Sequence, residues 1–340
     1  MKNLKFGCCL GGGDFDKLLM EAKRIEESEF DSIWVTDHIT SANLKKDYLN
    51  VWCYLTAYAT VTNRVGLGTL VTDPCRMNPA VLAQIVATID QISKGRMILG
   101  IGAGEAMNLV PFGIPANNRV QRMKESIQII KGLWTTKFFD YKGQFFNFNR
   151  AHLQAPPYQN PHPPIFVSAF SPKSRKIAAL EGDGWLSLAA SPSIIKQGLA
   201  EIREIAEKAG RNISGLEVVY FAEFSVAEDY EKAEKTIEAG ARRGLAVWPK
   251  NLRRLGYDAI DEFDYSRLIP DETTESKIKK FSETVPLEAV RVTAIYGTPQ
   301  DCIKKIEEFR AAGVTYLILR PPELENNLRL FNGDIRPNLI

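Results

Sequence analysis

The sequence contains only three histidines and five cysteines among its 340 residues. His38, His152 and His162 lie far apart in the chain, and the cysteines show neither a CxxC spacing nor a Cys/His spacing of the kind that binds zinc. We therefore expect no metal site. An odd number of cysteines is typical of reduced, mostly buried thiols, which indicates a cytoplasmic protein without a disulfide framework.

The chain also has no marked excess of charge and no long apolar run. Its 43 basic and 41 acidic residues give a formal net charge of +2, whereas binding to nucleic acid or to an anionic membrane requires concentrated positive charge. Apolar runs such as Met97–Ile101 and Tyr316–Leu319 are too short to span a bilayer. Residues Met1–Lys5 lead directly into an apolar strand without the core of a signal peptide. These features favour a small-molecule substrate over nucleic acid or membrane.

The sequence does contain a regular alternation of strand-like and helix-like segments. For example, Asp14 is expected to cap a helix whose apolar positions include Leu18, Ala22 and Ile25. The expected strands cover residues 4–9, 32–36, 65–71, 96–101, 165–169, 184–188, 216–227 and 314–320. Eight strands that alternate with helices favour an α/β fold of the (β/α)8 TIM-barrel type over a doubly wound sheet.

Two stretches depart from this alternation. Residues 142–164 are rich in proline, asparagine and aromatic residues and are expected to form an ordered excursion. Residues 229–292 have a helical and polar pattern and are expected to form a helical insertion between late elements of the barrel. Because no linker or low-complexity segment divides the chain, a single domain over residues 1–340 is predicted.

Two of the expected strands end abruptly in polar residues. One ends at Asp37 and His38, and another runs into the segment Gly102–Glu105. Parallel strands of one barrel would bring these groups to its C-terminal rim, where TIM-barrel active sites form. His38 and Glu105 can exchange protons, and the glycines allow a flat ligand to approach the backbone. The alternatives are a helix cap for Asp37, a surface position for His38 and a simple tight turn for the glycines.

A third candidate position follows the strand expected at residues 165–169. Small residues precede a helix that begins at Pro172, so that free backbone N–H groups and the helix dipole could bind an anion. Lys173 could add positive charge. An ordinary helix cap is the alternative.

Together these motifs resemble those of the luciferase-like flavin and deazaflavin oxidoreductases. The resemblance rests on residues 32–38, 69–79, 87–108 and 163–165, and it extends to residues 297–299 and 313–319. The sequence Gly-Ala-Gly-Glu-Ala-Met-Asn at 102–108 is most similar to the branch that uses coenzyme F420. That branch includes F420-dependent alcohol and glucose-6-phosphate dehydrogenases and methylenetetrahydromethanopterin reductase. The resemblance implies a TIM barrel that transfers hydride between coenzyme F420 and a small organic substrate.

The resemblance also implies roles for individual residues. Asp37 would contact the deazaflavin ring, and His38 and Glu105 would handle the substrate proton. The family carries a non-prolyl cis peptide in its third strand, which here would fall between Leu70 and Val71 and would support the ring. The other positions implied to bind the cofactor are Gly104, Glu105, Asn108 and, near the phosphate, Ala169.

Several alternatives to this function stay open. An FMN-dependent monooxygenase of the same fold is the second hypothesis, and a non-catalytic flavin-binding homologue is the third, since a fold does not fix a function. The chain has Gly11–Gly13 where the dehydrogenases carry a glutamate, and Thr40–Asn43 where they carry a tryptophan, so the substrate is not transferable. A homodimer is expected because such dimers are the commonest assemblies.

Overall fold

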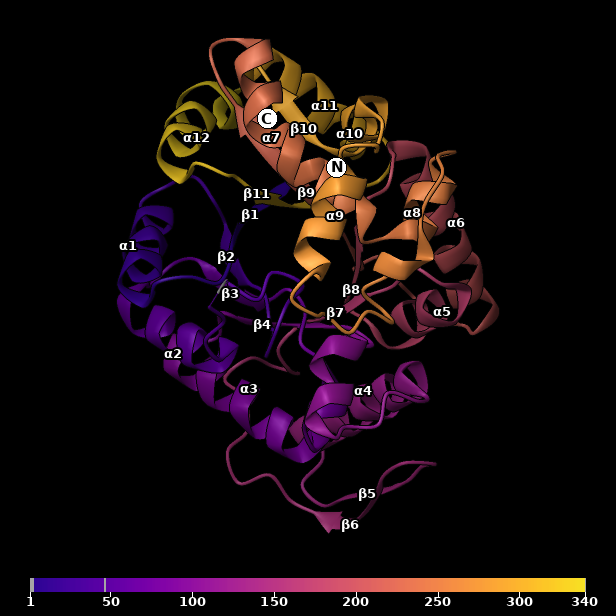
Figure 1. The fold of residues 1–340 in the computed structure, drawn as a ribbon. Helices are drawn as coiled ribbons and strands as arrows, with labels where there is room; N and C mark the ends of the chain where they lie inside the picture. Colours follow the sequence, from indigo (N-terminus) through magenta and orange to yellow (C-terminus); the bar gives the residue numbers. More distant parts are fainter. Residues whose placement is uncertain (1–2, 46, 340) are drawn as a thin grey trace.

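The structure is a computed structural model that describes residues 3–45 and 47–339. Met1 and Lys2, on which the signal-peptide expectation partly rests, and Ile340, at the end of the predicted domain, lie outside these residues. Within the described ranges, eight parallel strands close into a barrel surrounded by helices (Figure 1). The barrel strands are β1 (Lys5–Leu10), β2 (Ser32–Val35), β3 (Gly66–Thr69), β4 (Met97–Ile101), β7 (Ile165–Ser168), β8 (Gly184–Leu188), β9 (Glu217–Val226) and β11 (Tyr316–Arg320). The TIM-barrel prediction is confirmed.

A helix follows each barrel strand. These helices are α1 (Phe15–Glu26), α2 (Val51–Val61), α3 (Pro79–Ser93), α4 (Arg119–Thr135), α5 (Pro172–Glu181), α6 (Pro192–Lys208), α7 (Tyr230–Ala246) and α12 (Leu324–Leu330). Local sequence sets their starts: Oδ1 of Asp14 accepts a hydrogen bond from the backbone N–H of Lys17, as the cap prediction required, and Pro79 is the first residue of α3. None of the helices formed by the described residues has the length and apolar character needed to cross a membrane.

Two short elements differ from the expectations. An antiparallel hairpin of β5 (Phe139–Lys142) and β6 (Asn147–Ala151) projects beside α4 (Figure 1). It packs closely there, because a Cβ atom at Gly132 would lie 2.0 Å from the Phe139 ring. Strand β10 (Ile295–Gly297) pairs with the end of β9 and precedes α11 (Pro299–Ala311). Neither element is easily predicted from the sequence, because these strands are only three to five residues long.

The chain between β9 and β10 is helical. After α7 it contains α8 (Pro249–Arg254), the 3₁₀ helix η4 (Asp261–Phe263), α9 (Thr274–Ser282) and α10 (Leu287–Thr293). We call residues 247–268 the roof segment. Its residues Val247, Phe263 and Leu268 belong to one apolar cluster with Met107, which follows β4, so the roof segment is held against the rim of the barrel. That residues 229–292 are an insertion into a single domain stays a prediction.

Trp34 fills the interior of the barrel. Its indole is fully buried, stacks on Phe166 and meets Tyr316 edge-on. Cβ atoms at Gly7 and Gly68 would lie 2.4 and 2.3 Å from this indole, so both positions need glycine to leave it room. Because the interior is packed with side chains, a ligand site of this barrel must lie at its rim.

Candidate active site

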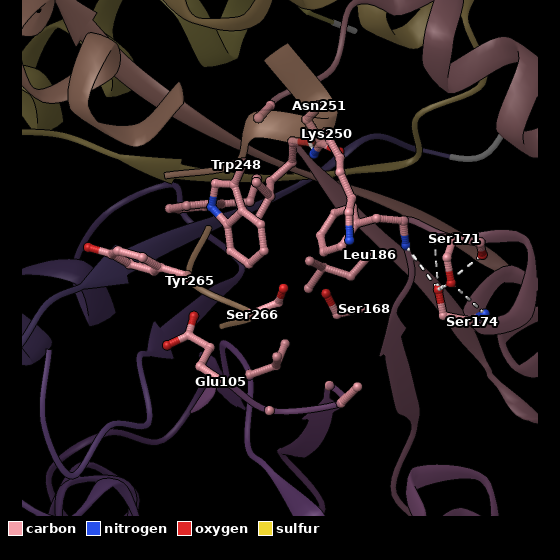
Figure 2. Close-up of a pocket in the computed structure, with 18 of the residues that line it drawn as sticks. Glu105, Ser168, Ser171, Ser174, Leu186, Trp248, Lys250, Asn251, Tyr265 and Ser266 are labelled. Atoms are coloured by element: carbon pink, nitrogen blue, oxygen red, sulfur yellow. Dashed lines mark hydrogen bonds between the residues drawn. The ribbon is translucent and has the colours of Figure 1, made fainter. Parts of the chain in front are cut away.

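A cavity of about 1090 Å³ opens at the C-terminal rim of the barrel. The loops after β2, β3, β4 and β7 line one side, and the roof segment lines the other. Figure 2 shows the indole of Trp248 pointing into this space toward Ser168 and Ser266, with Glu105 across from it. The volume is sufficient for a cofactor-sized ligand together with a small substrate.

A carboxamide joins the loops after β2 and β4. Oδ1 of Asn108 accepts hydrogen bonds from the backbone N–H groups of Ile39 and Thr40, at 2.7 and 3.0 Å. Its Nδ2 therefore faces the other way and lies 3.1 Å from Nδ1 of His38 and 3.4 Å from Oε2 of Glu105. The same Oε2 lies 3.5 Å from Nδ1 of His38. The two titratable groups predicted from the sequence thus meet at the rim around one amide.

The environment of Glu105 favours its protonated form. Burial raises the pKa of this carboxyl group to about 8, and the negative charge of Asp73 acts in the same direction. Arg76, Arg119 and the amide of Asn108 oppose the shift without cancelling it. Glu105 can therefore carry a proton at neutral pH and release it in a mildly alkaline range, as a general acid or base requires.

Asp37 is held by two neighbours in the loop after β3. Its Oδ2 accepts a hydrogen bond from Oγ1 of Thr72 at 2.7 Å and pairs with the guanidinium group of Arg76. The carboxylate lines the cavity but is only 7% exposed. Its position is consistent with a role beside a bound ring, and that role stays a prediction.

Sequence reasoning missed Asp73 and Arg76. Among the described residues, Oδ2 of Asp73 and Nε of Arg76 are buried without a hydrogen-bond partner and lie 4.0 Å from each other as an ion pair, and Asp73 lines the cavity. Burial raises the pKa of Asp73 to about 6. Buried polar atoms without partners are uncommon, and at the wall of a cavity they suit a polar ligand. The one signal in the sequence was a carboxylate directly after the third strand, which alone is typical of a proline turn.

Gly104 holds the loop after β4 against Asp73. Its φ angle is +83°, and a Cβ atom would lie 2.0 Å from Oδ2 of Asp73. Glycine is required here for both reasons. The close contact between Gly104 and Asp73 also brings Glu105 near the carboxylate of Asp73.

The peptide between Leu70 and Val71 is cis, and this prediction is confirmed. The bond follows β3, and both residues line the cavity. Leu70 also belongs to the apolar cluster around Trp34, so this part of the cavity floor rests directly on the packed interior of the barrel.

The start of α5 lies at another part of the cavity. Ser171 and Ser174 form a capping box, and Ser171 and Lys173 line the cavity. Ala169 does not line it: the residue is buried, and its carbonyl oxygen accepts a hydrogen bond from the indole of Trp185. The flanking residues Ser168 and Phe170 line the cavity in its place. The other predicted positions, Asp37, His38, Leu70, Val71, Gly104, Glu105 and Asn108, all line the cavity.

Comparisons with known proteins agree with this geometry. A family model described as luciferase-like monooxygenase matches residues 7–316. The chain belongs to this family. The resemblance noted from the sequence motifs is thereby confirmed, together with the fold that it implied.

The proteins similar to this chain include reductases and a dehydrogenase. The 5,10-methylenetetrahydromethanopterin reductase of Archaeoglobus fulgidus is 31% identical over 323 residues, which cover 93% of this chain and 94% of the reductase. A solved structure of an F420-dependent secondary alcohol dehydrogenase in complex with an F420–acetone adduct has a TM-score of 0.83 and 26% identity, with 99% of both chains covered. The coenzyme F420-dependent tetrahydromethanopterin reductase of Methanopyrus kandleri shares the fold, with a TM-score of 0.86, 23% identity and coverage of 99% of this chain and 100% of the reductase.

Proposed function

We propose that this protein is a coenzyme F420-dependent oxidoreductase that acts on a small organic substrate. The observation that carries the proposal is the arrangement of His38, Asn108 and Glu105 on one cavity whose floor contains the cis peptide after β3. When bound at this cavity, coenzyme F420 would supply the hydride-transfer chemistry. The protein supplies binding, orientation and proton transfer around it.

The residues at the cavity fit such a cofactor. Leu70 and Val71 offer an apolar floor for a flat ring, and Gly104, which has no side chain to obstruct a ligand, lines the same cavity. Oδ2 of Asp73, which accepts no hydrogen bond from the described residues and lies 4.0 Å from Nε of Arg76, offers an acceptor to a polar ring edge. At the start of α5, Lys173 and the helix dipole suit an anionic group such as the cofactor phosphate.

The chain's own residues would handle the proton that accompanies hydride transfer. Below about pH 8 Glu105 is protonated and can donate to a substrate oxygen or nitrogen; in the reverse direction its carboxylate accepts the proton. His38, oriented by Asn108, is placed to share that proton with Glu105. Trp248 and Tyr265 in the roof segment reduce the access of water to the reacting atoms.

Titration of the purified apo-protein tests the cofactor. Quenching of tryptophan fluorescence is measured with coenzyme F420 and, separately, with FMN. The proposal expects tighter binding of coenzyme F420. Preference for FMN, together with oxygen consumption in the presence of a reduced-flavin supply, would instead support the alternative of an FMN-dependent monooxygenase. Binding of neither would contradict both.

Two variants then separate chemistry from binding. Glu105→Gln and His38→Gln should lose turnover by at least about a hundredfold while the dissociation constant of coenzyme F420 stays within about threefold of wild type. Glu204→Gln, on the exposed face of α6, is the matched control and should behave as wild type. If the two site variants lost binding and turnover together, their roles would be structural.

We also propose that the protein is a single-domain homodimer located in the cytoplasm. The proposal rests on the balanced charge, the odd number of cysteines and the frequency of two-fold assemblies. Light scattering coupled to size-exclusion chromatography measures the mass of the assembly, and a mass of one chain would contradict the dimer.

A further inference from the structure

Arg119 bridges two segments that lie far apart in the sequence. It is the first residue of α4, and its guanidinium donates from Nη1 to the carbonyl oxygen of Gly104 at 2.7 Å and from Nη2 to the carbonyl oxygen of Ser266 at 2.8 Å. Gly104 directly precedes Glu105, and Ser266 lies in the roof segment. One side chain therefore joins the loop that carries the acid–base residue to the cover of the cavity.

Within residues 3–45 and 47–339, no hydrogen bond runs directly between these two segments. Within the roof segment, a local hydrogen bond fixes the turn at Ser266: Oδ1 of Asp264 accepts a hydrogen bond from the backbone N–H of Ser266 at 2.9 Å. Apolar packing links the segments through Met107 and Phe263, which share one cluster. Apolar contacts are not directional, whereas two hydrogen bonds from one planar guanidinium fix both distance and orientation.

We infer that Arg119 is a positioning residue that couples the placement of Glu105 to closure of the roof segment over the cavity. The inference rests on the proposed function for the meaning of Glu105, but the bridge itself is a property of the chain. Loss of the bridge releases the two segments together. Tyr265 directly precedes Ser266 and its ring contacts that of Trp248, so loss of the bridge should also move these two cavity-lining side chains.

Hydrogen exchange on the apo-protein tests the bridge without cofactor or substrate. In Arg119→Ala, backbone amides of residues 102–108 and of residues 261–268 should both exchange about tenfold faster or more, because each segment loses a charge-assisted hydrogen bond. Arg119→Lys cannot hold both carbonyl groups and should show a smaller increase in both segments. If Arg119→Ala fails to fold, the comparison of Arg119→Lys with wild type tests the inference instead.

Arg122→Ala is the matched control. Arg122 lies one turn further along α4, but its guanidinium stacks over the Phe145 ring and does not line the cavity. Its loss should leave exchange in both segments at wild-type rates. Faster exchange in only one segment of Arg119→Ala, or equal effects of the two alanine variants, would overturn the inference.

Turnover gives a second readout that a merely structural role would not move. The charged and titratable groups around Glu105 are His38, Tyr48, Asp73, Arg76, Arg119 and Tyr265. Removal of the positive charge in Arg119→Ala should shift the alkaline midpoint of the pH–rate profile upward, whereas Arg119→Lys should keep it. An unchanged midpoint in Arg119→Ala would contradict the coupling. Failure of the wild-type protein to bind coenzyme F420 would count against the proposed function and leave the exchange result to stand by itself.

Discussion

Nδ2 of Asn108 lies 3.1 Å from Nδ1 of His38. Because two backbone N–H groups already occupy the carboxamide oxygen, the nitrogen must face the ring, and Nδ1 must then act as the hydrogen-bond acceptor. In its neutral form His38 therefore carries its proton on Nε2. One amide thus sets the tautomer of the histidine and, through its contact with Glu105, the relation between the two proton-exchanging groups.

Asn108→Asp should disrupt this arrangement without changing the shape of the side chain. A carboxylate oxygen would face Nδ1 of His38 and draw a proton onto it, and the added negative charge would stand next to Glu105. We expect kcat/KM to fall by at least about tenfold with little change in cofactor affinity. Asn212→Asp is the control, because the exposed Asn212 only accepts a local hydrogen bond that an aspartate can also accept. A variant with wild-type kinetics would show that the tautomer is unimportant.

The pH dependence of turnover should report on Glu105. In the direction in which the substrate gains a proton, kcat/KM should fall above about pH 8, because the pKa of Glu105 is raised to about 8 and the acid must start protonated. In the opposite direction kcat/KM should rise up to the same pH. This change of kcat/KM near pH 8 should be absent in Glu105→Gln. A midpoint near 4.5, the ordinary value for a glutamate, would contradict this assignment.

Stability should also depend on pH through the same group. Since the pKa of Glu105 is higher in the folded protein than its ordinary value of 4.5, the folded state loses stability relative to the unfolded state as the pH rises from about 4.5 to about 8. Glu105→Gln does not ionise and should escape this loss. Its free energy of unfolding relative to wild type should therefore increase across that range, by an amount on the order of 4 kcal/mol. Urea unfolding at pH 5 and pH 9 measures the change, and a constant difference between the proteins would argue against it.

The loop after β4 should tolerate no side chain at Gly104. Gly104→Ala adds a Cβ atom 2.0 Å from Oδ2 of Asp73 at a φ angle of +83°, so it should destabilise the fold by roughly 2–4 kcal/mol and weaken cofactor binding. Gly113→Ala separates the two causes: its φ angle is +71°, but no atom lies within 4 Å of the added Cβ. That variant should cost only about 1 kcal/mol. Thermal denaturation compares the two, and equal losses would mean that the contact with Asp73 is unimportant.

The barrel could be predicted from the sequence because most of its strands are buried on both faces and appear as short, mainly apolar runs that alternate with helical patterns. The same logic placed Asp37, His38 and Glu105 together, since parallel strands bring their C-terminal ends to one rim. The prediction for Asn108 came from the family motif, and the structure places this residue at the same rim. What each of these residues contacts followed only from the structure.

Other parts of the site had no local signal. Arg119 and Ser266 are separated by 147 residues, and no pattern in the sequence relates a helix-starting arginine to a backbone carbonyl group in a distant loop. Asp73 and Arg76 belong to a turn whose conformation decides where the side chains point. Ala169 illustrates the converse: the small residue predicted near the phosphate is turned into the core, and its neighbours Ser168 and Phe170 line the cavity.

The bridge made by Arg119 recognises only main-chain atoms at both of its ends. Any residue at position 266 can present the same carbonyl group, so the bridge places no demand on the side chain there, whereas Val247, Phe263 and Leu268 still have to pack against the rim. Variation at a roof residue that lines the cavity but lies outside the apolar cluster, such as Ser266 itself, could then change which molecules the cavity admits while Arg119 still holds the segment.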